Sequence, residues 1–211
     1  TLFGPSEQLR GVSLFVGRTS DVEVLESAPD PFSMPARTIE SIYNYSAAGE
    51  LNRRMRVRGV VTGYIPGHPV EISDFTSTAR FRFVRHVVYV DDGSGGARVE
   101  TEQPQRVAPG TILDVVGFPT ATAGRPILTN AIFRVVGTAA QPKPVPVKAE
   151  NVLSPENDAT LIRMEGHMLS ILRNPRERVL VLRVGESVFD ANLEAGSESA
   201  ALERITPGSM V

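Results

Sequence analysis

The 211-residue sequence predicts an all-β protein built from repeated small barrels, and three observations support this prediction. Apolar and polar residues alternate over many short segments, which is the periodicity of half-buried strands. Proline-rich and glycine-rich segments separate these strands, as linkers and turns do. The strand pattern of residues 55–61, with Gly59 at its centre, returns at residues 162–168 around Gly166, 107 positions later.

Two further repeats define how the units follow one another. Residues 22–25 recur as residues 133–136, displaced by 111 positions, and residues 107–111 recur as residues 205–209, displaced by 98. The unequal spacings indicate loop insertions within one common unit. The expected divisions are residues 1–34 (C-terminal strands of an upstream barrel), 35–52 (linker with a short helix), 53–138 (complete barrel), 139–158 (proline-rich linker) and 159–211 (N-terminal part of a further barrel).

Two short strands and a helix are expected before the complete barrel. Residues 12–16 and 22–25 are strand-like and flank a turn-forming segment. Residues 38–45 place Ile39 and Ile42 at helical spacing, which predicts a short linker helix.

Five strands are expected within the complete barrel. Gly59 lies in the middle of the first strand, where a glycine marks the sharp bend of a coiled small barrel. Five strands with such a bend predict an OB-like, five-stranded Greek-key barrel, and roughly 85 residues suffice for one. An SH3-like barrel and a half-sandwich remain alternatives. The expected strands are residues 54–64, 81–90, 97–100, 111–118 and 126–136.

The further barrel is expected to contain strands at residues 161–172, 178–184 and 187–193, followed by a short helix at residues 199–205. Residues 207–211 match the entrance to strand four, so we expect the last two strands to be missing. The partial barrels at the two ends would then complete each other, within one chain or between two chains of a homodimer.

Composition and motif spacing give no indication of catalysis. The chain has no cysteine, which excludes disulfides, thiolate metal sites and cysteine nucleophiles. His68, His86 and His167 show no metal-ligand spacing, and no serine, histidine and aspartate pattern stands out. The formal net charge of −2 predicts no general attraction to nucleic acid or anionic lipid. We expect a protein without catalytic residues, metal or cofactor, and therefore not an enzyme.

One feature of the central barrel favours nucleic acid. Residues 53–138 carry 11 arginines against seven acids, interleaved with aromatic residues. Barrels that hold single strands combine basic grooves with aromatic platforms, but a solvated strand face and core packing explain the same residues. In the repeat Glu165 takes the place of Arg58, and an acid there argues against a phosphate track, so nucleic acid is not the expected partner. The candidate ligand or partner face is Arg56, Arg58, Tyr64, Phe81, Phe83, Tyr89 and Arg98.

A series of strand and turn motifs extends over most of the chain, at residues 13–16, 21–26, 28–32, 57–62, 88–96, 101–104, 108–110 and 114–119. These motifs resemble the repeated extracytoplasmic region of certain bacterial two-component sensor histidine kinases. The resemblance implies a periplasmic or extracytoplasmic input module of a parent protein anchored in the inner membrane. No kinase motif occurs in these residues, and the resemblance supplies no ligand residue.

The favoured hypothesis is a non-catalytic sensory module that signals by rearrangement between barrels and binds a small molecule, a glycan or an envelope protein. The alternative is an OB-fold protein that binds single-stranded nucleic acid. A third interpretation, a carbohydrate- or envelope-binding adhesion module, rests on the habit of such barrels of binding oligosaccharides.

Overall fold

The computed structural model describes residues 2–3, 9–11, 16–42, 53–73, 80–122, 125–152, 154–173, 177–194 and 204–211. The chain divides into two compact units, residues 1–30 and residues 31–211. Within the described residues, no helix has the length and apolar character needed to cross a membrane.

The described residues of the first unit contain little regular structure. Strands β1 (Leu2–Phe3) and β2 (Leu9–Gly11) form an antiparallel pair, and η1 (Thr19–Asp21) is a single 3₁₀ turn. The strand predicted at residues 22–25 is wrong, because these residues pair with no described strand and Leu25 is 88% exposed. Most of the strand predicted at residues 12–16 lies outside the described residues.

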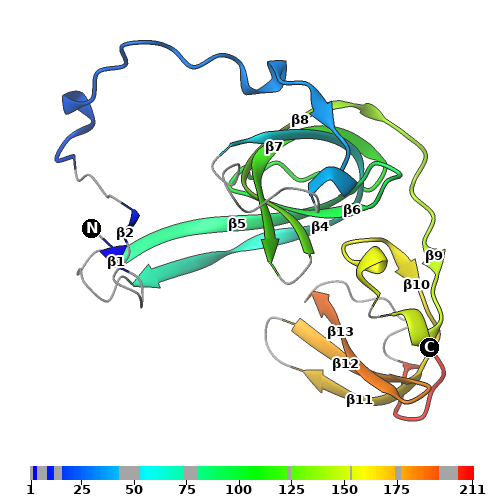
Figure 1. Ribbon diagram of the computed structural model, residues 1–211. Coiled ribbons are helices and arrows are strands. Elements are labelled where there is room, and N and C mark those ends of the chain that lie inside the picture. Colours follow the sequence, from blue (N-terminus) through cyan, green and yellow to red (C-terminus); the bar gives the residue numbers. More distant parts are fainter. Residues whose placement is uncertain are drawn as a thin grey trace. The chain divides into compact units, whose positions relative to one another are not determined.

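A closed five-stranded barrel dominates the second unit (Figure 1). Its strands follow the order β4-β5-β6-β8-β7, and β7 pairs back with β4 to close the barrel. β6 and β8 run parallel, and every other pair in the barrel is antiparallel. This order confirms the all-β class and the OB-like Greek-key barrel. The strands are β4 (Met55–Ser73), β5 (Arg80–Asp91), β6 (Gly96–Thr101), β7 (Thr111–Thr122) and β8 (Arg125–Thr138).

Strands β4 and β5 continue beyond the barrel wall. β4 pairs with β7 only over residues 55–60, and β5 pairs with β6 only over residues 86–91. The remaining residues of β4 and β5 pair with each other and form a long hairpin, visible in Figure 1. The strands predicted at residues 54–64 and 81–90 are therefore present, and the first is longer than expected.

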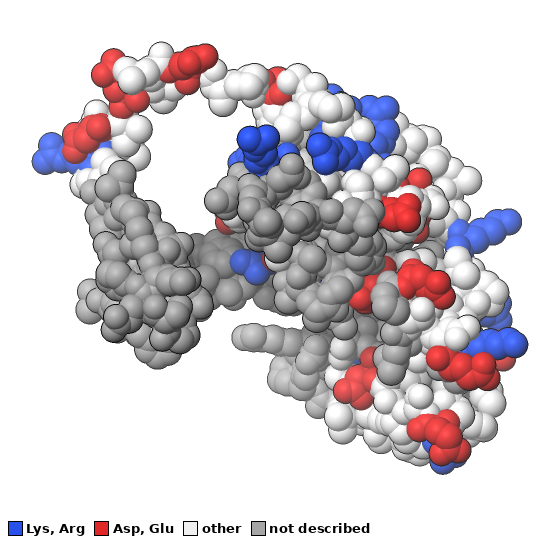
Figure 2. All heavy atoms as spheres, in the orientation of Figure 1, with Lys and Arg blue, Asp and Glu red and all other residues white. Residues whose placement is uncertain are grey.

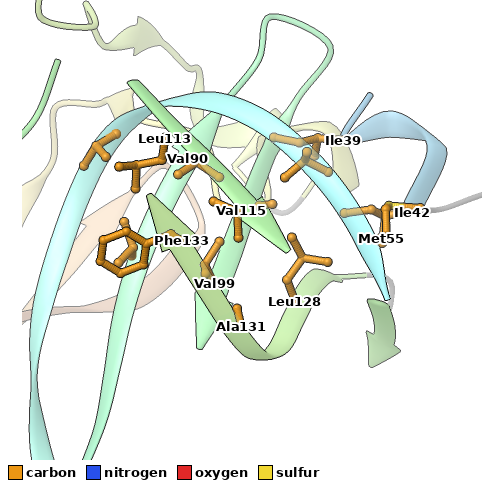
Figure 3. Close-up of a cluster of buried hydrophobic side chains, with 14 of the residues drawn as sticks. Ile39, Ile42, Met55, Val90, Val99, Leu113, Val115, Leu128, Ala131 and Phe133 are labelled. Atoms are coloured by element: carbon orange, nitrogen blue, oxygen red, sulfur yellow. The ribbon is translucent and has the colours of Figure 1, made fainter. Parts of the chain in front are cut away.

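Alternate residues of the strands fill the barrel interior with β-branched and other apolar side chains (Figure 3). Val57, Val99, Leu113 and Val115 are fully buried, and each such side chain contributes about 1.5–3 kcal/mol relative to exposure. The chain before β4 adds two more core residues, Ile39 and Ile42, of which Figure 3 shows Ile42 beside Met55.

A short parallel strand pair occurs at the corresponding point of the barrel and of the C-terminal part. β3 (Ala36–Arg37) pairs with the start of β4, and β9 (Val145–Pro146) pairs with β10 (Ile162–Arg163). The expected linker helices are single 3₁₀ turns, and residues 43–45 of the helix predicted at residues 38–45 lie outside the described residues. These turns are η2 (Pro31–Ser33), η3 (Glu40–Ile42), η4 (Ala149–Asn151) and η5 (Pro155–Asn157).

The C-terminal part forms a three-stranded antiparallel sheet of β11 (His167–Arg173), β12 (Glu177–Val184) and β13 (Ser187–Glu194). This confirms the hairpin predicted around Gly185. Gly166 and Val211 exchange two backbone hydrogen bonds of 2.9 Å, which brings the chain end beside the start of β11. The described residues of this part form a sheet, so an array of barrels remains a prediction.

A glycine lies at the same bend in the barrel and in the C-terminal sheet. A Cβ atom on Gly59 would lie 3.0 Å from the carbonyl oxygen of Asp91. A Cβ atom on Gly166 would lie 3.1 Å from the carbonyl oxygen of Arg183 and 2.6 Å from Val184 Cγ2. In both places the facing strand approaches so closely that a side chain would collide with it, as expected where a barrel strand bends sharply.

The local hydrogen bonding repeats as well. The strand pairing shifts register directly after Val61 in the barrel and directly after Met168 in the C-terminal sheet. The amide of Gly110 donates to the carbonyl of Val61 at 2.9 Å, and the amide of Gly208 donates to that of Met168 at 2.8 Å. The sequence repeat therefore extends to the bend, the bulge and the closing hydrogen bond.

Candidate functional site

A buried carboxylate on β7 gathers three arginines from the outer face of the barrel. Asp114 is fully buried, and it accepts hydrogen bonds from Arg56 Nη2 at 2.8 Å, Arg58 Nε at 2.7 Å and Arg134 Nη2 at 3.1 Å. The strand register explains this, because Asp114 lies opposite Arg58 on β4 and opposite Arg134 on β8. We call these four residues the Asp114 cluster.

The three guanidinium groups keep Asp114 ionised. Hydrogen bonding from Arg58 lowers the pKa of Asp114 to about 2, assisted by Arg56 and Arg134 and opposed by burial, which raises it. The pKa of Arg58 is raised by its hydrogen bond to Asp114 and by the attraction of that charge. The cluster therefore holds three cations and one anion.

The Asp114 cluster also holds the segment that precedes β4. Arg56 Nη1 donates to the carbonyl oxygen of Met34 at 2.8 Å, and the guanidinium of Arg134 lies 4.5 Å from the centre of the Phe32 ring. The Arg56 side chain is only 14% exposed, whereas that of Arg58 is 54% exposed. Arg56 thus belongs to the internal structure of the barrel, and Arg58 still faces solvent.

Tyr89 and Arg98 lie opposite each other on the outer face of β5 and β6. Their neighbours Val88, Val90 and Val99 point into the core, so the alternation of the strands turns Tyr89 and Arg98 outward. On the other side Tyr89 pairs with Gly63 of β4, and a Cβ atom there would lie 3.6 Å from the Tyr89 ring. The ring therefore lies against backbone on that side.

A second ion cluster borders Tyr89. Glu100 binds Arg85 Nη1 at 3.1 Å and Arg98 Nε at 3.2 Å, and its side chain is mostly buried between them. The two arginine side chains remain 43% and 39% exposed. We call Arg85, Val87, Tyr89, Arg98 and Glu100 the β5–β6 face.

Tyr64 lies on the opposite side of the strands from Tyr89. It packs against the core cluster, and its hydroxyl lies 2.7 Å from His86 Nδ1 with the two rings stacked at 5.9 Å. The amide of Gly67 donates to the same nitrogen at 2.9 Å, so Nδ1 is the acceptor of both hydrogen bonds. Tyr64 therefore supports the hairpin.

The predicted residues thus fall into separate groups. Tyr89 and Arg98 lie together, Arg56 and Arg58 join the Asp114 cluster, and Tyr64 stands apart with His86. Phe81 and Phe83 lie on β5, and their side chains are outside the described part of the structure.

The acids Asp114 and Glu100, which bind the arginines, were not among the residues predicted for the candidate face. Asp114 interrupts the apolar run of residues 111–118, and an acid inside such a strand is a signal that an arginine lies opposite it. Glu100 gives the same signal on β6. Arg85 and Arg134, which bind these two acids, were counted among the arginines but were not assigned to the candidate face.

The face seen in Figure 2 shows no general separation of charge, because basic and acidic side chains are interspersed over its described part. Among the described residues no three His, Asp or Glu side chains lie together as a metal site requires.

Comparison with known proteins gives similar structures and no family. No protein-family model matches the sequence, and no curated protein matches it. The similar solved structures include a p202 HIN1 domain in complex with a 12-mer double-stranded DNA, with 10% identity and a TM-score of 0.40, covering 80% of this chain and 85% of that one.

Two other similar structures also contain DNA. One is a replication protein A heterotrimer bound to single-stranded DNA, with 12% identity and a TM-score of 0.37, covering 72% of this chain and 42% of that one. The other is fission yeast Pot1 with single-stranded DNA, with 9% identity and a TM-score of 0.32, covering 83% of this chain and 76% of that one.

These structures correct one expectation from the sequence. Nucleic acid was not the expected partner, and this expectation is contradicted, because the similar barrels are complexes with double-stranded or single-stranded DNA. The TM-scores of these structures are below 0.5, so the residues that this chain would use for binding are argued from its own structure alone.

Proposed function

We propose that the barrel binds single-stranded nucleic acid across the β5–β6 face. The observation that carries this proposal is the cross-strand pair of Tyr89 and Arg98, an aromatic ring beside a guanidinium on the outer wall. β5 and β6 are the second and third strands of the barrel, and OB-like barrels bind oligonucleotides on the face of these two strands.

The chemistry of the face suits a base and its phosphate. Tyr89 is half-buried, and the accessible part of an aromatic ring can stack on any base, which is worth about 1–3 kcal/mol per base. Glu100 binds both Arg85 and Arg98 and orients their guanidinium groups beside the ring. Arg98 is 39% exposed and contacts Glu100 through Nε, so its Nη groups can donate to phosphate oxygens.

The other predicted residues take supporting places in this proposal. Arg58, half-exposed on β4, offers a further phosphate contact, whereas Arg56 and Tyr64 support the fold. Phe81 and Phe83 precede Tyr89 along β5 and stay predictions from the sequence.

Fluorescence anisotropy with a labelled 12-nucleotide single strand of mixed sequence, at low salt, tests the proposal. Tyr89→Ala should weaken binding about tenfold or more, because it removes the stacking surface. Tyr89→Phe is the matched control, which keeps the ring and should bind nearly as the native protein does. Equal affinity of the alanine variant and the native protein would overturn the proposal.

The role as a sensory module has no support among the described residues. Nothing in the fold or in the comparisons connects the chain with a sensor histidine kinase, so this hypothesis is set aside. An extracytoplasmic location and the lack of catalysis remain predictions from the sequence. The nucleic-acid proposal depends on neither of them.

A further inference from the structure

A small basic pocket lies where the segment before β4 meets the start of that strand. Its volume is about 130 Å³, and β3 forms one wall by pairing in parallel with β4, Ala36 opposite Arg56. None of the residues of the β5–β6 face contributes to it. The lining residues are Met34, Pro35, Arg37, Arg53, Arg54, Met55 and Arg56.

The pocket concentrates positive charge without an acid. Four of its seven lining residues are arginines and none is aspartate or glutamate. The acid that Arg56 does reach, Asp114, also binds Arg58 and Arg134 and so cannot neutralise the pocket. Like charges held this close repel each other, and an anion between them would relieve the repulsion.

Hydrogen-bond donors are available in the pocket. Arg56 Nε is buried and, among the described residues, is the one buried side-chain nitrogen or oxygen without a hydrogen-bond partner. Arg37 and Arg53 are exposed and form no ion pair with a described acid. The guanidinium of Arg54 lies 5.3 Å from the centre of the Phe118 ring, which leaves its N–H groups open at the edge.

We propose that this pocket binds a phosphate-sized oxyanion. At ~30 Å³ for each water, 130 Å³ holds about four waters, which suits an ion of five heavy atoms. Arginine binds phosphate oxygens through paired N–H groups, and four arginines line this pocket. The ligand is free inorganic phosphate or the terminal phosphate of a nucleic acid strand.

The repeat supplies an internal comparison. Thr160 and Leu161 take the places of Arg53 and Arg54 before β10. The groove beside β9 and β10 has mixed charge, because Glu150 and Glu165 lie in its lining together with Lys143, Lys148 and Arg163. A pocket lined by four arginines and no acid is therefore a property of the barrel and not of the repeated backbone.

Thermal unfolding in phosphate and in chloride, at equal ionic strength and pH, tests the pocket. Phosphate should raise the Tm of the native protein, and the double variant Arg37→Gln/Arg53→Gln should lose this shift. Arg106→Gln, an exposed arginine outside the pocket, is the matched control and should keep it. A native protein without the shift, or a double variant that retains it, would overturn the proposal.

A second measurement distinguishes the two sources of phosphate. If a strand end is the ligand, a terminally phosphorylated single strand should bind about tenfold tighter than its hydroxyl form, and the double variant should remove the difference. If free phosphate is the ligand, the two strands should bind equally while the Tm shift persists. Tyr89→Ala should leave the Tm shift unchanged, so failure at the pocket and failure at the β5–β6 face are separate results.

Discussion

The first long strand of the barrel and its copy in the C-terminal sheet share a backbone but differ in charge. Arg56 and Arg58 precede the bend at Gly59, and Arg163 and Glu165 take the same places before Gly166. In the barrel both arginines bind the buried Asp114. In the copy Arg163 and Glu165 lie 3.4 Å apart and both are about 70% exposed.

This difference shows which strand determines the charge at these positions. The bend, the bulge and the closing hydrogen bond repeat because they depend on backbone geometry. The charge does not repeat, because in the barrel it complements Asp114 of β7. The replacement of Arg58 by Glu165 in the copy is therefore no evidence against nucleic acid at the barrel. The charge at this position of the barrel is explained by the ion pair between Arg58 and Asp114.

Removal of the buried carboxylate should have the largest effect. Asp114→Asn leaves three arginines without their anion, and the cost should be about 2–3 kcal/mol, below that of a fully buried ion pair, because only Arg56 is mostly buried while Arg58 and Arg134 are screened by solvent. Urea unfolding monitored by circular dichroism measures the loss. A variant as stable as the native protein would contradict the conclusion that the arginines of the barrel depend on Asp114.

The two glycines at the bends should be intolerant of a side chain to a similar degree. Gly59→Ala and Gly166→Ala each force a Cβ against a facing strand, and overpacking of this kind costs about 1–3 kcal/mol. Gly137→Ala is the matched control, because its Cβ would meet only Ile112 Cδ1 at an ordinary 3.6 Å. Chemical denaturation of the three variants checks this, and a neutral Gly166→Ala beside a destabilised Gly59→Ala would show that the bends differ.

Acid should destabilise the barrel through Asp114. Its pKa is about 2 in the fold and 3.8 ordinarily, so its ion pairs stabilise the fold above pH 3.8 and are lost as the pH falls toward 2. The expected loss is about 1–2 kcal/mol, because the half-exposed arginines are screened by solvent. Stability measured against pH should show this loss in the native protein and lack it in Asp114→Asn. An identical acid profile in both proteins would contradict the assignment.

The smallest effect is expected at the exposed pair in the copy. Glu165→Gln removes one partner of a solvent-exposed ion pair, which should change stability by less than about 0.5 kcal/mol. The same urea experiment used for Asp114→Asn measures it. A loss of several kcal/mol would mean that Glu165 has a buried partner like that of Arg58.

Much of the barrel could be predicted from the sequence, because the alternation of apolar residues directly reports which face of a strand is buried. The five strands and the bend at Gly59 follow from this pattern. Residues 22–25 carry the same pattern without becoming a strand, because pairing depends on a partner that local sequence does not contain.

The candidate site was harder to predict, because ion pairs form between residues far apart in the chain. Asp114 and Arg56 are separated by 58 positions and meet only through the closure of β7 on β4. The alternation did turn Tyr89 and Arg98 outward together. It could not show that the stacking partner of Tyr64 is His86, because a bulge in the hairpin shifts that pairing.

The burial of Ile39 and Ile42 in the barrel has a practical consequence for expression. A fragment that starts at Arg53 would omit both side chains, expose the floor of the hydrophobic interior to water and invite aggregation. A fragment that starts at Pro31 keeps Ile39 and Ile42 in the core, and it keeps the cation–π contact between Phe32 and Arg134. The smallest autonomously folding piece of this protein should therefore begin about twenty residues before its first long strand.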